Sequence, residues 1–348
     1  MITSVSTRSL FGATRTTLVR AQSALALAQK ETTTARHADV GKSLGFMTGH
    51  AISFRNDYAQ LGAIRDANSI AQTRLSATQS VLEGLAEDAQ SFLGSLVGAR
   101  NSDGGARVLA VEAEARLKSL INGINTAIEG AHIFSGIDSD NTPLEEYFGN
   151  PTAASRQAVA DAFTGAFGFA PSDPAVNSIS EADMQGFLSG AFADLFEEPS
   201  WSAYWSRASD ENISSRISTS EVIETSANAN ASAIRKLVSV YVMVADLGGE
   251  RLNDGAFQAI VDTAIEATGA AIQDLTGLRT KLGIAEDRIA TANERISIKM
   301  DVLTKHITNL EAVDPYEASL RVTSLLIQIE TAYALTARLQ QMSLIYHL

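Results

Sequence analysis

Apolar residues recur at steps of three and four along the N-terminal flank of the chain. This 3.5-residue period is typical of a helix that packs against a partner helix as in a coiled coil. The positions of this seam are Leu61, Ile64, Asn68, Ala71, Leu75, Thr78, Leu82, Leu85, Ala89, Phe92 and Leu96. We expect a turn at residues 101–105 and then a second helix, whose apolar side consists of Val108, Val111, Ala115, Ile121, Ile124 and Ile128.

The C-terminal flank carries a matching seam. Its positions are Leu275, Leu278, Leu282, Ala285, Ile289, Ala292, Ile296, Met300, Leu303, Ile307 and Leu310. The step from Ile296 to Met300 breaks the alternation of three and four, and such a stutter predicts local unwinding of the supercoil. Asp314 and Pro315 then predict a helix break, because aspartate caps helix N-termini and proline suits the first helical position.

The two ends of the chain carry thinner seams. Leu18, Ala21, Leu25 and Ala28 lie at helical spacing in a region rich in Ser and Thr, which predicts a helix that forms only beside a partner seam. The last helix carries Val322, Leu325, Ile329, Ala332, Thr336 and Leu339, and apolar residues continue to Leu344 and Leu348. Because termini usually fray, an end this apolar predicts a surface for it to cover, in the chain or on a neighbour.

Proline and charge mark the middle of the chain as a separate region. Five of the six prolines lie between residues 143 and 199. Residues 137–230 hold fifteen Asp/Glu against three Arg, whereas residues 1–60 hold seven Arg/Lys against three Asp/Glu. In the middle region we expect short helices at 153–167 and 180–196, one or two strands within 213–223, and a small core anchored by Trp201 and Trp205.

The pattern therefore predicts a mainly α protein. We expect a long coiled-coil-like helical bundle formed by the N- and C-terminal segments, with a small inserted α+β domain in the middle. Residues 1–137 and 246–348 would form the discontinuous helical core, and residues 138–245 a surface-exposed acidic insert. We expect residues 1–58 and 290–348 to be mobile until assembly.

Composition narrows the function. The 348-residue chain has no cysteine, which excludes disulfides, cysteine metal sites and thiol catalysis. Its net charge of −13 argues against general nucleic-acid binding. No stretch approaches the ~20 apolar residues of a membrane span, and the first thirty residues lack the apolar run of a cleaved signal peptide. The five histidines show no metal-ligand spacing, so we expect no metal, no cofactor and no enzymatic activity.

Two stretches carry a family resemblance. Residues 130–136, Gly-Ala-His-Ile-Phe-Ser-Gly, with Pro143 after them, resemble the glycine–tyrosine–isoleucine–phenylalanine–small–glycine segment of flagellin-like flagellar hook-associated proteins. His132 stands where that pattern usually has tyrosine. The end of the chain is similar to the end of the same family, at Asp314, Glu317, Ala318, Leu325, Glu330, Tyr333, Ala337, Arg338, Ser343, Leu344 and Leu348. Arg279, Leu282, Gly283 and Arg288 resemble the segment before it. Many relatives have a Ser-Asp-Asp-Pro-like segment after the first helix, but residues 42–49 read Lys-Ser-Leu-Gly-Phe-Met-Thr-Gly here.

The resemblance implies a structural component of the bacterial flagellum. Such a protein would join a hook-associated protein to the flagellin filament, through folding coupled to assembly in a helical lattice. The implied partners are flagellin, the hook-proximal hook-associated protein, copies of itself in a ring, a flagellar export chaperone and the export apparatus, with neither nucleic acid nor membrane among them. The resemblance also implies an extracellular position, reached without a cleaved signal peptide, with the insert facing outward.

The residues that we expect to form the assembly seams are spread over both flanks. They are Leu18, Leu25, Leu61, Ile64, Leu75, Leu82, Leu85, Phe92, Leu282, Ile289, Ile296, Leu303, Leu310, Leu325, Ile329, Tyr333, Leu339, Leu344 and Leu348. Two other functions fit the same patterns. One is flagellin itself, the filament subunit of the same family. The other is a secreted amphipathic helical protein that acts on membranes, although the alanine-rich seams and the 6 % aromatic content speak against it.

Overall fold

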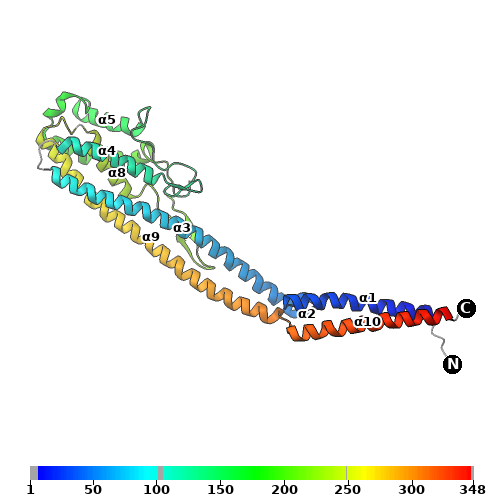
Figure 1. Cartoon of the computed structure of the whole chain (residues 1–348). Helices are drawn as coiled ribbons and strands as arrows, with labels where there is room; N and C mark the ends of the chain where they lie inside the picture. Colours follow the sequence, from blue (N-terminus) through cyan, green and yellow to red (C-terminus); the bar gives the residue numbers. More distant parts are fainter. Residues whose placement is uncertain (1–6, 101–104, 248, 346–348) are drawn as a thin grey trace. The chain divides into compact units, whose positions relative to one another are not determined.

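The chain divides into two compact units (Figure 1). The terminal unit comprises residues 1–62 and 297–348, and the central unit comprises residues 63–296. The computed structural model describes the backbone of residues 7–100, 105–247 and 249–345, and the side chains of residues 12–100, 105–247 and 249–338. Two long helices, α3 (Thr48–Ala99) and α9 (Asp254–Glu311), contribute residues to both units.

The predicted mainly α fold is confirmed. The terminal unit also contains α1 (Thr7–Thr34), α2 (Val40–Leu44), the 3-10 turn η1 (Gly45–Met47) and α10 (Pro315–Ile345). The helices of the central unit are α4 (Gly105–Ile124), α5 (Ala154–Phe167), η2 (Pro174–Ser178), α6 (Glu181–Phe187), the π-helical turn η3 (Leu188–Phe192), η4 (Ala193–Phe196), α7 (Ser200–Tyr204) and α8 (Ser232–Asp246). Its strands form two hairpins, β1 (Ala127–Ile128) with β2 (Ala131–His132) and β3 (Ser214–Arg216) with β4 (Val222–Glu224).

The seam predicted on α3 is the buried face of that helix. All eleven positions from Leu61 to Leu96 are buried, and Leu75, Leu82 and Phe92 have no exposed surface. Steps of three and four keep these side chains on one stripe of the helix, so a single partner helix can cover them.

The partner along this stripe is α9, which runs antiparallel to α3 within the central unit (Figure 1). The Asn68 side chain donates a hydrogen bond to Asn293 Oδ1 at 2.8 Å, and Gln79 Nε2 donates to the Arg279 carbonyl at 2.8 Å. The residue number therefore falls along α9 as it rises along α3. The α9 seam is buried at Leu275, Leu282, Ala285, Ile289, Ala292, Ile296 and Met300, and half-buried at Leu278, Leu303, Ile307 and Leu310.

The apolar side predicted for α4 is partly wrong. Val108, Val111 and Ala115 are exposed, whereas Ile121 and Ile124 are buried as expected. The buried stripe consists of Leu109, Ala113, Leu117, Leu120, Ile121 and Ile124. This helix has apolar residues on two sides, and the larger leucines lie on the side that packs into the core with α8. The helix also ends at Ile124, so that Ile128 lies in β1 and is half-buried.

The middle of the chain matches its predicted elements. The helix expected at 153–167 is α5, and the one expected at 180–196 is α6, η3 and η4 in succession, with the Ser180 hydroxyl capping α6 at Asp183 N. The strands expected within 213–223 are β3 and β4. Trp201 and Trp205 are buried and stack on one another at 5.9 Å between ring centroids. Both tryptophans are thus buried as predicted, but they belong to one continuous core that includes the buried stripes of α3 and α9, and not to a small core of their own.

In the terminal unit, α1 lies antiparallel to α10 (Figure 1). The predicted helix break is confirmed, because α9 ends at Glu311 and α10 begins at Pro315. The Asp314 carboxylate accepts a hydrogen bond from the Tyr316 backbone N–H at 2.8 Å, and so caps α10. The turn expected at 101–105 lies outside the described residues, apart from Gly105, which begins α4.

Candidate assembly surfaces

Many of the predicted seam residues lie inside the chain. In the central unit, Ile64, Leu75, Leu82, Leu85, Phe92, Leu282, Ile289 and Ile296 are all buried between the chain's own helices. Phe92 also meets the Tyr241 ring of α8 edge-on at 5.2 Å, and the Arg116 guanidinium lies 5.7 Å from its centroid. These side chains hold the central unit together. While the central unit is folded, they offer no surface to a partner.

The seam residues of the terminal unit are covered less completely. Leu61 and Ile329 are buried, and Leu18, Leu25, Leu303, Leu310 and Leu325 are half-buried. Tyr333 is 52 % exposed, and its hydroxyl accepts a hydrogen bond from Gln22 Nε2 at 3.0 Å. The side chains of Leu339 and Leu344, and the whole of Leu348, lie outside the described residues. Whether any of these residues acts in assembly stays a prediction.

The outer face of α10 is a second apolar stripe, which the sequence analysis did not select. Tyr316, Leu320 and Ile327 are 83 %, 71 % and 58 % exposed. Spacings of four and seven place them on one side of the helix, opposite the inward-facing Leu325 and Ile329. Only four residues of α10 are charged, namely Glu317, Arg321, Glu330 and Arg338. A helix that is apolar on both sides is normally buried on both sides in its working state.

Other large apolar side chains of the terminal unit are also uncovered. They are Val19 and Leu27 on α1, Phe46 on η1, Ile52 and Tyr58 on α3, Ile298 and Val302 on α9, and Leu326 and Leu335 on α10. Single exposed apolar residues are common on protein surfaces, but a group of this size on one unit is typical of an interaction surface. The sequence signal that could have found it is the scarcity of charge along α10 as a whole.

The segment at residues 130–136, which carries the family resemblance, folds into a tightly bonded turn. Phe134 and Ser135 are fully buried, and their carbonyls accept hydrogen bonds from Ala229 N and Ser209 N at 2.8 and 3.0 Å. Gly136 has a φ of 63°, and a Cβ on it would lie 2.5 Å from the Glu211 carbonyl oxygen. The close approach of these backbones therefore requires glycine. The His132 ring contacts the Asn125 carbonyl at 2.9 Å through Nδ1.

A partly buried polar network fastens the middle region to α8. Asp246 accepts hydrogen bonds from Arg156 Nη2 at 2.9 Å, from Arg156 Nε at 3.0 Å and from the Tyr147 hydroxyl at 2.9 Å. Burial, with the adjacent Asp246 carboxylate, raises the pKa of Tyr147 far above its usual value of 10.0, so this hydroxyl stays a donor. The Asp246 hydrogen bond likewise raises the pKa of Arg156. The network fixes position and has no reactive group.

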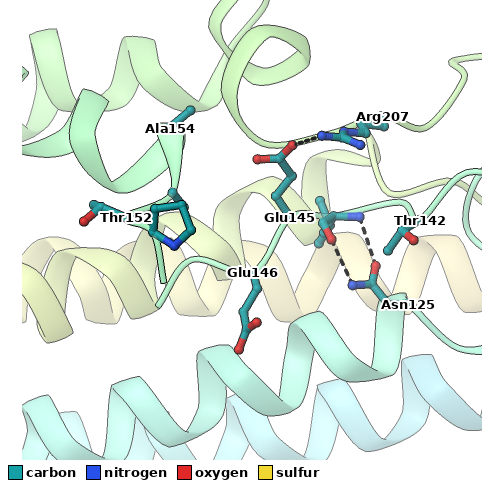
Figure 2. Close-up of a pocket in the computed structure, with 10 residues that line it drawn as sticks. Asn125, Thr142, Glu145, Glu146, Thr152, Ala154 and Arg207 are labelled. Atoms are coloured by element: carbon teal, nitrogen blue, oxygen red, sulfur yellow. Dashed lines mark hydrogen bonds and ion pairs between the residues drawn. The ribbon is translucent and has the colours of Figure 1, made fainter. Parts of the chain in front are cut away.

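An open pocket of about 480 Å³ lies beside the end of α4 (Figure 2). The Asn125 amide brackets the Leu144 backbone with two hydrogen bonds of 2.9 Å, and Glu145 pairs with Arg207 across the rim. These contacts tie the loop to α4 and pair three of the polar side chains that line the pocket, Asn125, Glu145 and Arg207. Within the described residues no three metal-binding side chains meet, and no helix there combines the length and apolar character of a membrane span.

Sequence and structure comparisons identify the family. The N-terminal helical region of bacterial flagellin matches residues 5–139, and the C-terminal helical region matches residues 265–348. Curated proteins give no match. A Vibrio parahaemolyticus protein, provisionally named a flagellar hook-associated protein, has a TM-score of 0.51 at 11 % identity, over 76 % of this chain and 97 % of its own. FlgL of Bacillus cereus has a TM-score of 0.49 at 12 % identity, over 74 % of this chain and 99 % of its own.

The long paired helices define a helical structural protein whose terminal unit leaves several large apolar side chains exposed. The chain belongs to the flagellin family, whose two helical regions together match more than half of it. It is thus a structural component of the bacterial flagellum, an extracellular appendage, and this family points to a non-enzymatic role.

Proposed function

We propose that this protein joins the hook side of the flagellum to the flagellin filament, and that it does so by folding its terminal segments against neighbouring subunits. The observation that carries the proposal is the outer face of α10, where Tyr316, Leu320 and Ile327 are exposed although the helix has few charges. A face of this kind gains free energy when a neighbour covers it. Its contacts would be between unlike surfaces, as in a ring or a helical lattice.

The remaining parts of the proposal follow from this arrangement. Residues 1–58 and 290–348 would become fully ordered only on assembly, because two paired helices bury too little surface to offset their ordering entropy. The insert at 138–245 would face outward, since fifteen of the acidic residues lie in 137–230. The partners would be flagellin, the hook-proximal hook-associated protein, further copies of this chain in a ring, an export chaperone and the export apparatus, with secretion that needs no cleaved signal peptide.

Immunogold electron microscopy of native flagella tests the position directly. An antibody raised against residues 140–230 should label one band between hook and filament, and it should label nothing in a strain that lacks the protein. Label along the whole filament would instead make the protein a flagellin. Purified protein supplies a second test, because a junction protein should not seed long filaments from itself, whereas a filament subunit should.

A further inference from the structure

A buried carboxylate lies where α9 ends. Glu311 has no exposed surface, and its Oε2 accepts a hydrogen bond from Arg55 Nη2 of α3 at 2.5 Å. The same oxygen lies 3.8 Å from Arg36 Nη1, while Oε1 meets no donor among the described residues. Burying a carboxylate is costly even when it is paired, so such groups are better suited to fixing one arrangement than to adding stability.

Two connecting segments lie beside this carboxylate, residues 35–39 between α1 and α2 and residues 312–314 between α9 and α10. Backbone hydrogen bonds join these two linkers. Val313 N–H donates to the Ala35 carbonyl at 3.0 Å, and His37 N–H donates to the Glu311 carbonyl at 2.9 Å. Ala35 has a φ of 51°, a left-handed conformation that alanine rarely adopts. A residue stays in such a conformation only where the surrounding contacts hold it there.

A second buried glutamate connects α1 to α10 next to these linkers. Glu31, in the last turn of α1, is 8 % exposed. Its carboxylate accepts a hydrogen bond from Ala38 N at 3.1 Å and pairs with Arg321 Nη1 of α10 at 3.1 Å. We call Glu31, Arg36, Arg55, Glu311 and Arg321 the joint cluster. It joins four helices of the terminal unit, α1, α3, α9 and α10.

On the α1 side, the contacts with α10 become weaker with distance from the joint cluster. Gln22 and Tyr333 share an exposed hydrogen bond, whereas the pair of Glu31 and Arg321 has one buried partner, Glu31, and one half-exposed partner, Arg321. Along α1, Ala28 is buried, but Leu25 and Leu18 are only half-buried. The pairing of the two helices is therefore most complete at the end that carries the joint cluster.

We propose that the joint cluster is the site at which α1 and α10 begin to pair, so that the terminal helices order from the joint toward the two chain ends. Val313 follows α9 by two residues, so once the end of α9 folds it holds Val313 near its partner, and the first contact closes a short loop. Each later turn then adds to an existing nucleus, which costs less than starting a new one. In the monomer the pairing stops partway, and neighbours that cover the outer faces complete it.

Hydrogen exchange with mass spectrometry on the full-length monomer tests this inference. In the wild type, protection should be highest at residues 28–34 and 315–325 and should fall toward residues 12–20 and 330–338. Arg55→Met and Glu311→Gln should lower protection along both helices at least tenfold and leave residues 63–99 unchanged. Arg65→Met is the matched control, because Arg65 contacts only its exposed neighbour Asp66 among the described ion pairs, at 3.8 Å.

Three results would overturn the inference. In the first, Arg55→Met and Glu311→Gln lower hydrogen-exchange protection only beside the substituted residue and not along α1 and α10. Another is a wild-type chain without protection in α1 and α10 even beside the joint. The third concerns Tyr333→Phe, which removes the outer hydrogen bond. The inference fails if this substitution lowers hydrogen-exchange protection beside the joint cluster as strongly as Arg55→Met does. The inference extends the coupled folding proposed above, but the monomer reports on it whether the protein lies at the junction or in the filament.

Discussion

In the central unit α3 and α9 pack together with α4 and α8, and Leu75, Leu82 and Phe92 have no exposed surface. In the terminal unit α1 and α10 form a two-helix pair, and Leu25 and Leu325 stay half-exposed although they follow the same spacing. The spacing of apolar residues thus fixes which stripe of a helix turns inward. The number of helices that meet there decides how completely the stripe is covered.

Charge separates the two units as well. The terminal unit, residues 1–62 and 297–348, contains eleven Arg/Lys and eight Asp/Glu. The central unit, residues 63–296, contains sixteen Arg/Lys and thirty-two Asp/Glu. Copies of the chain therefore repel one another much less through the terminal unit than through the central unit. Lower coverage and lower net charge are the two features of the terminal unit that support the proposal that other chains bind there.

The largest effect is expected from the core of the central unit. Phe92→Ala should lower the free energy of unfolding by about 3–5 kcal/mol, because it leaves a cavity beside Tyr241 and Arg116. Urea denaturation followed by circular dichroism measures it. Val108→Ala, at a 68 % exposed position, is the control and should stay within about 0.5 kcal/mol. Equal losses in the two variants would contradict the closed core.

Gly136→Ala should cost about 2–4 kcal/mol, since the new methyl group would lie 2.5 Å from the Glu211 carbonyl and the backbone is left-handed. Gly130→Ala separates the two causes. Gly130 has a φ of 85° but open space around it, so it should show only the backbone cost of about 1 kcal/mol. A similar loss in both variants would mean that the close approach of the backbones does not matter.

Asp246→Asn should lower the free energy of unfolding by roughly 2 kcal/mol, because Arg156 and Tyr147 lose their shared charged acceptor. Thermal unfolding of the full chain gives the comparison. Glu145→Gln disturbs the exposed pair with Arg207 and should change stability by less than about 0.5 kcal/mol. If both variants behave alike, the network adds nothing beyond an ordinary surface pair.

The smallest loss among seam residues is expected in the terminal unit. Leu303→Ala removes a half-buried side chain and should cost only about 1 kcal/mol in the monomer. A loss as large as that of Phe92→Ala would show that the terminal unit is closed in solution, and so would remove the contrast between the two units.

Much of the fold could be predicted from spacing alone. The α3 seam was correct at every position, because leucines and isoleucines form only one continuous stripe there. The buried side of α4 could not be decided from the sequence, since Val108 and Val111 follow the same helical spacing as Leu109 and Leu117. Packing against the rest of the chain determines which set is buried. The helix break at Asp314 and Pro315 could be predicted because helix capping depends only on residues that are close together in the sequence.

The assembly surface was harder to find. Periodicity identifies the stripe that faces a helix's nearest partner, so it selected Leu325 and Ile329 and overlooked Tyr316 and Leu320. The joint cluster was also invisible, because Arg55 and Glu311 are 256 positions apart in the chain and meet only in the folded unit. Polar pairs of this kind leave no repeat in a sequence.

The central claim is that the outer face of α10 is an assembly surface. The most direct measurement is electron microscopy of flagella from cells whose only copy carries Leu320→Asp and Ile327→Asp, beside a matched control with Tyr204→Asp and Val222→Asp in the middle region. Both substituted α10 positions are exposed, so the monomer should keep its stability within about 0.5 kcal/mol. The account predicts hooks without filaments for the α10 variant and normal flagella for the control. Normal filaments in the α10 variant would contradict it.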